Sequence, residues 1–203
     1  MHFGDIAGLE SLAEQLGSHA RRFGSAAHSG DAAVGEFFSH GDEPQLPSIK
    51  AFSVRWAEVR RLLSELERAA DRCSSVLETL ARQLSRARTE WEPAVSHALS
   101  IGAIVVEEGT HTWVTPPLDA TPGNAHVYST ISRQLQDAKG IAHSAWSTAL
   151  AELDAVPTVH AGDLVKAAAS NPPVDSGSSA VDAELRRLLP EILSAGLTAT
   201  ALR

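Results

Sequence analysis

Between Ser48 and Trp91, apolar residues alternate at spacings of four and three positions, and no glycine or proline interrupts the segment. This heptad repeat is how a long α-helix buries one edge against neighbouring helices. A helix of about 44 residues is about 65 Å long, and a helix of that length needs partners along it. The two rows of the repeat are Trp56, Leu63, Ala70, Leu77, Leu84 and Trp91, and Phe52, Val59, Leu66, Cys73, Leu80 and Ala87.

Two further segments show the same spacing and are the expected partners of this helix. The first runs from Ile6 to Ala27 behind a capping Asp5, and the second runs from Thr121-Pro122 to about Ala155 with an alanine-rich apolar face. Residues 28–47 contain glycines and prolines and are expected to form a loop. The β-branched residues of segment 103–115 predict a small hairpin.

The sequence therefore predicts an all-α fold, an elongated antiparallel helical bundle with one very long helix (about 48–91), a small hairpin and a tethered C-terminal helix. Residues 1–157 are the expected bundle domain, 158–180 a short helix and flexible linker, and 181–203 an amphipathic helix. The apolar positions of that last helix are Leu185, Leu188, Leu189, Ile192, Leu193 and Leu197.

Composition excludes several classes of function. The 203 residues carry a formal net charge of −8, whereas a nucleic-acid-binding protein shows a basic stripe. The sequence contains no apolar run long enough to span a membrane and no basic-then-apolar signal peptide. We therefore expect either a cytoplasmic protein or one secreted by a route other than Sec. The single cysteine excludes an internal disulfide.

The sequence contains no motif that names a reaction. Gly-rich phosphate loops, H-E-x-x-H and G-x-S-x-G are all missing, so we expect no enzyme, no cofactor and no metal. Three loop clusters could still bind a metal through histidine and carboxylate, although helix capping explains their aspartates more simply. They are His28/Asp31, His40/Asp42 and His160/Asp163. Cys73 is expected to be a buried apolar residue, and His143 a half-exposed histidine on a helix.

A stretch around Trp91 resembles the W-x-G family of helical hairpins. It reads Leu80-x-x-x-Leu84-x-x-Ala87-x-x-x-Trp91-Glu92-Pro93-Ala94, and the opening Gly4-Asp5-x-x-x-Leu9-x-x-Leu12-Ala13 is similar to that family's first helix. The family comprises substrates of type VII (ESX) secretion and N-terminal domains of actinobacterial secreted effectors. The resemblance implies a corner between two helices at Trp91 and an obligate helical partner or a homodimer. Pro93 stands where the family has glycine, and the family's export signal, a tyrosine followed four residues later by an acid, is absent.

The leading hypothesis is a non-enzymatic helical protein that acts through protein–protein contacts, as a type VII secretion substrate or partner would. Its expected contact residues are Trp91 and Pro93 at the corner, Trp113 in the hairpin, and the last helix through Leu185, Leu189 and Ile192. One alternative is a helical-bundle metal protein or enzyme that uses the loop His/Asp clusters. Another is a cytoplasmic regulator or chaperone whose C-terminal helix docks on a client.

Overall fold

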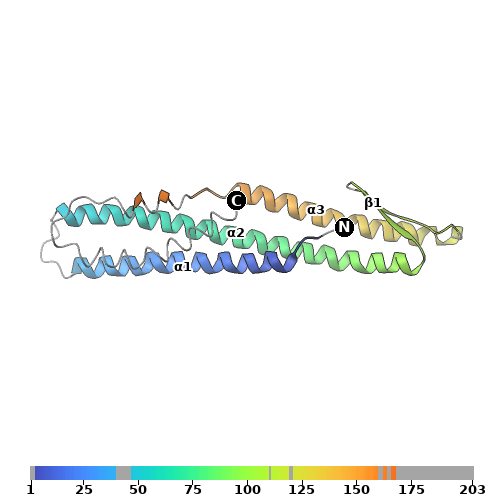
Figure 1. Ribbon diagram of the computed structural model, residues 1–203, viewed down its shortest axis with the longest axis horizontal. Helices are drawn as coiled ribbons and strands as arrows, with labels where there is room; N and C mark the ends of the chain where they lie inside the picture. Colours follow the sequence, from blue (N-terminus) through green and yellow to red (C-terminus); the bar gives the residue numbers. More distant parts are fainter. Residues whose placement is uncertain are drawn as a thin grey trace. The chain divides into compact units, whose positions relative to one another are not determined.

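The computed structural model describes residues 3–39, 47–109, 111–118, 121–159, 162–163 and 166–167. Its helices are α1 (Ile6–Ser39), α2 (Pro47–Ser100) and α3 (Ala125–Asp154), and α3 is preceded by the 3₁₀ turn η1 (Pro122–Asn124) (Figure 1). Strands β1 (Ile104–Glu108) and β2 (His111–Thr115) form an antiparallel hairpin. The all-α fold with a small hairpin is thus confirmed. The linker at 170–180 and the C-terminal helix lie outside the described residues.

The described chain divides into two compact units. The hairpin unit comprises Met1–Ala13 and Ser75–Ala155, and it contains both strands and all of α3. The loop unit comprises Glu14–Ser74 and the described residues from Val156 onward. Helices α1 and α2 contribute residues to both units, and each unit has its own buried apolar residues.

Helix α1 continues to Ser39, so the expectation of a loop beginning at residue 28 is wrong. The glycines suggested a break because glycine lowers helix stability. Packing reverses this effect at Gly30, where a Cβ atom would overlap the ring of Trp56. Glycine is therefore the residue that lets α1 pass the indole of α2. The core around this contact comprises Ala20, Phe23, Ala26, Ala27, Trp56, Val59, Leu62, Leu63, Leu66 and Ala70.

Close approach between α1 and α2 recurs at seven-residue intervals within the loop unit. A Cβ atom at Gly17 would lie 3.2 Å from the Ser74 hydroxyl oxygen, and one at Gly24 would press on the Glu67 carboxylate. One heptad further on, Asp31 accepts a hydrogen bond from Arg60 Nε at 2.7 Å. The residue numbers rise on α1 while they fall on α2, so the two helices are antiparallel here.

Helix α2 runs to Ser100 with Pro93 inside it, so the predicted end at Trp91 is wrong, and so is the helical corner implied there. A proline inside a helix removes one backbone hydrogen bond and costs about 3 kcal/mol. Burial on both sides opposes that cost, because Trp91 and Ala94 are only 7% and 4% exposed. Pro93 itself is exposed, as is Thr89 four residues earlier, so water can reach the carbonyl that the proline leaves without its partner.

The helix ends instead at Gly102, where φ is +71°. The Ala103 N–H donates to the Ala98 carbonyl at 3.0 Å, and the Gly102 N–H donates to the Leu99 carbonyl at 3.1 Å. This pair of hydrogen bonds is the Schellman motif, which needs a left-handed residue and therefore favours glycine.

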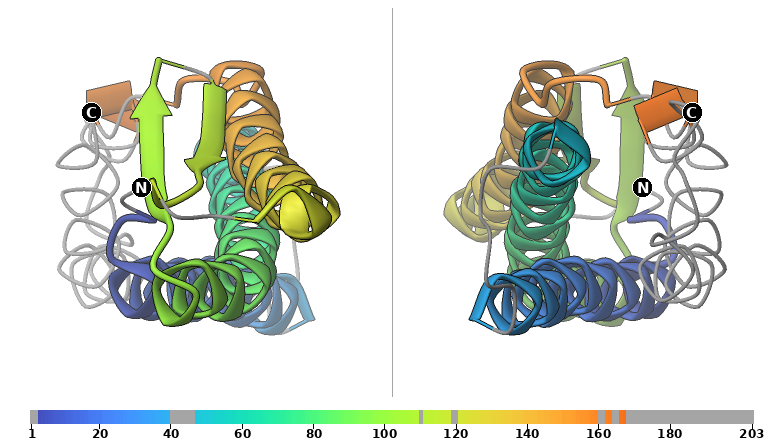
Figure 2. Two further views of the ribbon diagram at one scale, coloured as in Figure 1. Left: turned by 90° about the vertical axis from the view of Figure 1, so that its right-hand side faces the viewer. Right: turned by 90° about the vertical axis from the view of Figure 1, so that its left-hand side faces the viewer.

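The hairpin lies against α3, and β2 is the strand next to the helix (Figure 2). Side chains of α3 satisfy the backbone of β2: Ser132 accepts from the Val114 N–H at 2.9 Å, and Gln136 accepts from the Thr112 N–H at 2.8 Å. The Lys139 ammonium donates to the His111 carbonyl and to the Thr112 hydroxyl, both at 3.1 Å. One polar row on α3 therefore closes the strand edge that would otherwise be open.

Helix α3 has the predicted bounds to within a few residues, because the expected Thr121-Pro122 start becomes the η1 turn. The predicted apolar row is buried at Tyr128, Ile131, Leu135, Ala138, Ala142 and Ala149. These residues pack on α2 and the hairpin in two clusters, one around Trp91 and one around Leu80 and Leu84. Phe3 contacts both clusters, and its ring meets Trp91 edge-on with 6.2 Å between centroids.

Candidate functional site: a groove between α2 and α3

The His28/Asp31 pair lies inside α1 and has a structural role. Asp31 accepts a hydrogen bond from Trp56 Nε1 at 2.9 Å through one carboxylate oxygen and from Arg60 Nε through the other. The Asp31 side chain therefore links α1 to α2 in the loop unit. The expectation that Asp31 caps a helix is wrong. His28 is exposed beside it.

The other two His/Asp clusters are only partly described. His40, Asp42 and His160 lie outside the described residues, and Asp163 is 3.9 Å from Lys166 Nζ. Within the part of the chain that the structure covers, no three histidine, cysteine, aspartate or glutamate side chains gather as they would around a metal ion. The described residues thus give the metal hypothesis no geometric support.

Cys73 is half-buried in α2, where burial raises the pKa of its thiol. A raised pKa disfavours the thiolate, which is the nucleophilic form. The cysteine therefore lacks the electropositive, accessible setting that a reactive thiol requires.

The resolved pKa shifts of charged side chains belong to a surface ion-pair network. Arg61 hydrogen bonds both Glu58 and Glu65 on α2, and the bond from Arg61 lowers the pKa of the Glu58 carboxyl. The same contacts raise the pKa of Arg61. These groups are exposed, and such pairs contribute little to stability.

The expected contact residues fall into different settings. Trp91 is a core residue and is only 7% exposed. Its side chain is therefore not available for the contact role that the expected helical corner implied. Pro93 and His143 are exposed on their helices. Leu185, Leu189 and Ile192 lie outside the described residues.

Trp113 lies on the outward face of the hairpin. Val106 on β1 is paired directly opposite Trp113, and Ile104, two residues before Val106, lies on the same face. Trp113 is 37% exposed and Ile104 is 64% exposed, whereas Thr112 and Val114 on the inward face are buried. The hairpin thus holds an outward apolar surface of Ile104, Val106 and Trp113.

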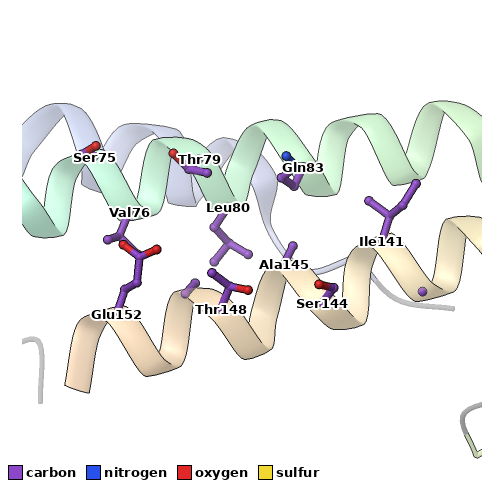
Figure 3. Close-up of a pocket in the computed structure, with 12 residues that line it drawn as sticks. Ser75, Val76, Thr79, Leu80, Gln83, Ile141, Ser144, Ala145, Thr148 and Glu152 are labelled. Carbon is purple, nitrogen blue, oxygen red and sulfur yellow. The ribbon is translucent and has the colours of Figure 1, made fainter. Parts of the chain in front are cut away.

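A groove of about 490 Å³ lies between α2 and α3 within the hairpin unit (Figure 3). Its apolar lining comes from Val76, Leu80, Ile141, Ala145 and Ala149. Short hydroxyl side chains lie along both sides of the groove, from Ser75 and Thr79 on α2 and from Ser144 and Thr148 on α3. Gln83 and Gly140 lie toward one end of the groove, and Glu152 lies toward the other end.

Glu152 is the one charged residue in the lining of this groove. Glu152 and Asp154 lie in the last turn of α3, which contains no basic residue. The carbonyl groups at the C-terminus of a helix add partial negative charge. Arg82 and Arg86 follow along α2 beside Gln83, and the second of these is paired with Glu90 at 3.0 Å.

The apolar repeat in the sequence does not reveal this groove. The repeat identifies the residues at the centre of the α2–α3 contact, whereas the groove lies on the flanks of both helices. Small residues recur in α3 at Gly140, Ser144, Ala145, Thr148 and Ala149, but their spacing alone does not show that they border a groove.

No family model, no curated protein and no solved structure matches this chain. Among the described residues, no helix combines the length and apolar character that crossing a membrane requires.

Proposed function

We propose that this chain is a non-enzymatic helical protein that acts by binding another protein. The outward apolar surface of the hairpin carries the proposal. Ile104 and Trp113 are exposed and Val106 is half-buried, on a backbone that β-pairing and the polar row of α3 both hold in place. Rigid exposed aromatic residues are typical anchors of protein interfaces.

We further propose that the partner belongs to a type VII secretion system. The support is the opening segment at Gly4, Asp5 and Leu9, where Asp5 caps α1 by accepting from the Gly8 N–H at 2.9 Å, together with the Ala- and Arg-rich composition. The unbroken course of α2 past Trp91 departs from that family's hairpin corner. The partner proposal therefore rests on the first helix and composition, and not on the Trp91 motif.

Size-exclusion chromatography with light scattering tests the binding proposal. The chain is measured alone and mixed with the products of neighbouring genes, and we expect a complex of defined mass. Trp113→Ser should weaken that complex by about tenfold or more, while Ser147→Ala, an exposed change on α3, should leave it intact. A monodisperse monomer that binds none of these proteins would contradict the proposal.

Export is tested separately in an actinobacterial host. We expect a tagged chain in the culture filtrate of the parent strain and not in that of a strain without its type VII secretion ATPase. Equal amounts in both filtrates would refute the secretion part and leave the binding part standing.

A further inference from the structure

We propose that the open edge of β1 binds an extended segment of a partner protein, which adds to the hairpin as an antiparallel third strand and carries a basic residue opposite Glu108. This inference deepens the proposed protein-binding function and rests on it, because it names the element that the partner contributes. The edge binds through backbone groups, whereas the outward apolar surface binds through side chains. Different substitutions therefore separate the two.

The hydrogen bonds of β2 show which backbone groups of β1 point to its far edge. The N–H groups of Thr112 and Val114 donate to side chains of α3, so both residues direct their backbone away from β1. This direction alternates from residue to residue along an antiparallel pair. Val106 therefore exchanges hydrogen bonds with Trp113. Val105 lies opposite Val114 and directs its N–H and C=O to the far edge.

That far edge is open. Strand β2 lies between β1 and α3, and no further strand borders β1 among the described residues (Figure 2). Within the same part of the chain, neither backbone group of Val105 has a hydrogen-bond partner. Its side chain is half-buried and packs on the Trp91 cluster, so the core holds this part of the edge in place. An open strand edge is a template for one more strand.

The repeat of the edge identifies its occupant as an extended segment. The backbone groups that point outward recur at every second residue, which is about 6.8 Å along a strand. Another extended backbone presents its own N–H and C=O groups with the same repeat. A helix uses these groups for its internal hydrogen bonds and cannot match them. Peptides do bind proteins by adding a strand to an open sheet edge.

The side chains beside the edge define the chemistry of that segment. Ile104, Val106 and Glu108 alternate along β1 and so share its outward face. Ile104 and Glu108 are exposed. In an added strand, the residues directly opposite these three lie within about 5 Å of them. An antiparallel segment that reads basic-x-aliphatic-x-aliphatic therefore places a cation beside Glu108 and apolar side chains beside the other two.

A second copy of this chain fits the same edge less well. Two β1 strands that paired antiparallel about Val106 would place Glu108 opposite Ile104 of the second copy, so the carboxylate would gain no cation. Each copy also has a formal net charge of −8, so the two copies repel each other. Charge thus favours a partner with a basic strand over self-association.

The test adds the synthetic peptide acetyl-Lys-Thr-Val-Thr-Val-amide to the full chain and follows backbone amides by NMR. We expect saturable shifts centred on β1, with slower hydrogen exchange at the Val105 amide. A twin peptide with Glu in place of Lys should bind about threefold more weakly. Glu108→Lys should reverse this preference, because the sign of the charge beside the edge is then reversed.

Methylation of the peptide backbone separates strand addition from other binding. In the antiparallel register, the N–H groups of the second and fourth peptide residues point at β1, and those of the third and fifth point away. A peptide with N-methyl groups at the second and fourth residues should bind about tenfold or more weakly. The matched peptide, methylated at the third and fifth residues, should bind within about twofold of the parent.

Two variants of the chain locate the same edge. Val105→Pro removes the outward N–H, and proline is tolerated there because this N–H does not pair with β2. Val105→Ile keeps the N–H and an apolar side chain. We expect about a fivefold or greater loss of peptide affinity for the first and less than a twofold change for the second. NMR contacts between Val106 and Trp113 check that the hairpin of each variant folds.

The possible outcomes separate the inference from the proposed function. The inference is overturned if the parent peptide does not bind, if the two methylated peptides bind alike, or if Glu108→Lys does not reverse the charge preference. It is also overturned if light scattering shows a dimer that Val105→Pro dissociates, because the occupant is then a second copy. If the complex with a partner protein persists in Val105→Pro and is lost in Trp113→Ser, the proposed function stands and the β1 edge is not its site.

Discussion

The two compact units of this chain build their cores differently from the same two helices. In the loop unit, large rings from one helix fit against glycine and alanine of the other, as Trp56 does over Gly30. In the hairpin unit, the alanine row of α3 meets leucines of α2, and a hairpin is added at one end. The comparison teaches that one heptad repeat can pack either its large rings against glycine and alanine or its leucines against an alanine row. What differs is the size of the residues that face it.

The largest expected effect tests whether the two cores are separate. Leu63→Ala in the loop unit and Leu135→Ala in the hairpin unit each remove a side chain that is 1% or less exposed, and each should lower the free energy of unfolding by about 3 kcal/mol. Hydrogen exchange should quicken mainly in residues 20–27 and 56–70 for the first variant, and mainly in α3 and the hairpin for the second.

Leu150→Ala serves as the control for this pair. Leu150 is 59% exposed on α3, so its loss should change the free energy of unfolding by about 0.5 kcal/mol or less. Faster exchange over both units in each core variant would show that the cores unfold as one.

The next effect tests the ring-on-glycine packing of the loop unit. Gly30→Ala should lower the free energy of unfolding by about 2 kcal/mol, because the added methyl group must displace the Trp56 ring. Gly35→Ala is the matched control, since nothing lies within 4 Å of a Cβ atom at that position. The control should gain about 0.5–1 kcal/mol from its higher helix propensity. Urea unfolding followed by circular dichroism measures both, and a stabilised Gly30→Ala would disprove the close contact.

A smaller and more local effect tests how the hairpin is held. Gln136→Ala should leave the Thr112 N–H without its acceptor, and Ser132→Ala should do the same to the Val114 N–H. Each loss is expected to cost about 1 kcal/mol and to accelerate exchange at that one amide. NMR exchange rates measure this, with Gln134→Ala, an exposed neighbour, as the control. Equal acceleration at both amides in either variant would mean that the hairpin detaches as a whole.

The smallest effect concerns Cys73. Because burial raises the pKa of its thiol, the folded chain keeps this proton at a pH where the unfolded chain releases it. The free energy of unfolding should therefore decrease slightly as the pH rises above about 8.5. Cys73→Ser should remove that part of the decrease. Iodoacetamide should also alkylate the thiol more slowly in the native chain than in urea, and equal rates would contradict its burial.

The sequence predicted the elements whose signal is local or periodic. The heptad rows of α2 are buried from Trp56 to Trp91 except at the half-buried Cys73, and the alanine row of α3, the Asp5 cap and the Glu108-Gly109 turn are present as predicted. The errors fell where packing outweighs propensity. Helix α1 continues through residues 28–39 despite their glycines, and Gly30 packs against the Trp56 ring. Helix α2 continues past Pro93, where Trp91 and Ala94 are buried on either side.

The groove and the Asp31 contacts could not be predicted, because both depend on which flank of one helix faces which flank of another. A repeat in one segment specifies its own buried edge but not the register of its neighbour. Asp31 illustrates this: its spacing suggested a cap or a ligand, and only its position opposite Trp56 and Arg60 shows its role. The seven-residue spacing of Gly17, Gly24 and Asp31 likewise shows its meaning only beside Ser74, Glu67 and Arg60 of α2.

The distribution of the four tryptophans has a practical consequence. Trp91, Trp113 and Trp146 all belong to the hairpin unit, so Trp56 is the only indole in Glu14–Ser74. A chain in which the first three are phenylalanine would carry one emitter, buried and hydrogen bonded to Asp31. The emission wavelength of Trp56 would then report the unfolding of the loop unit without a contribution from tryptophans of the hairpin unit.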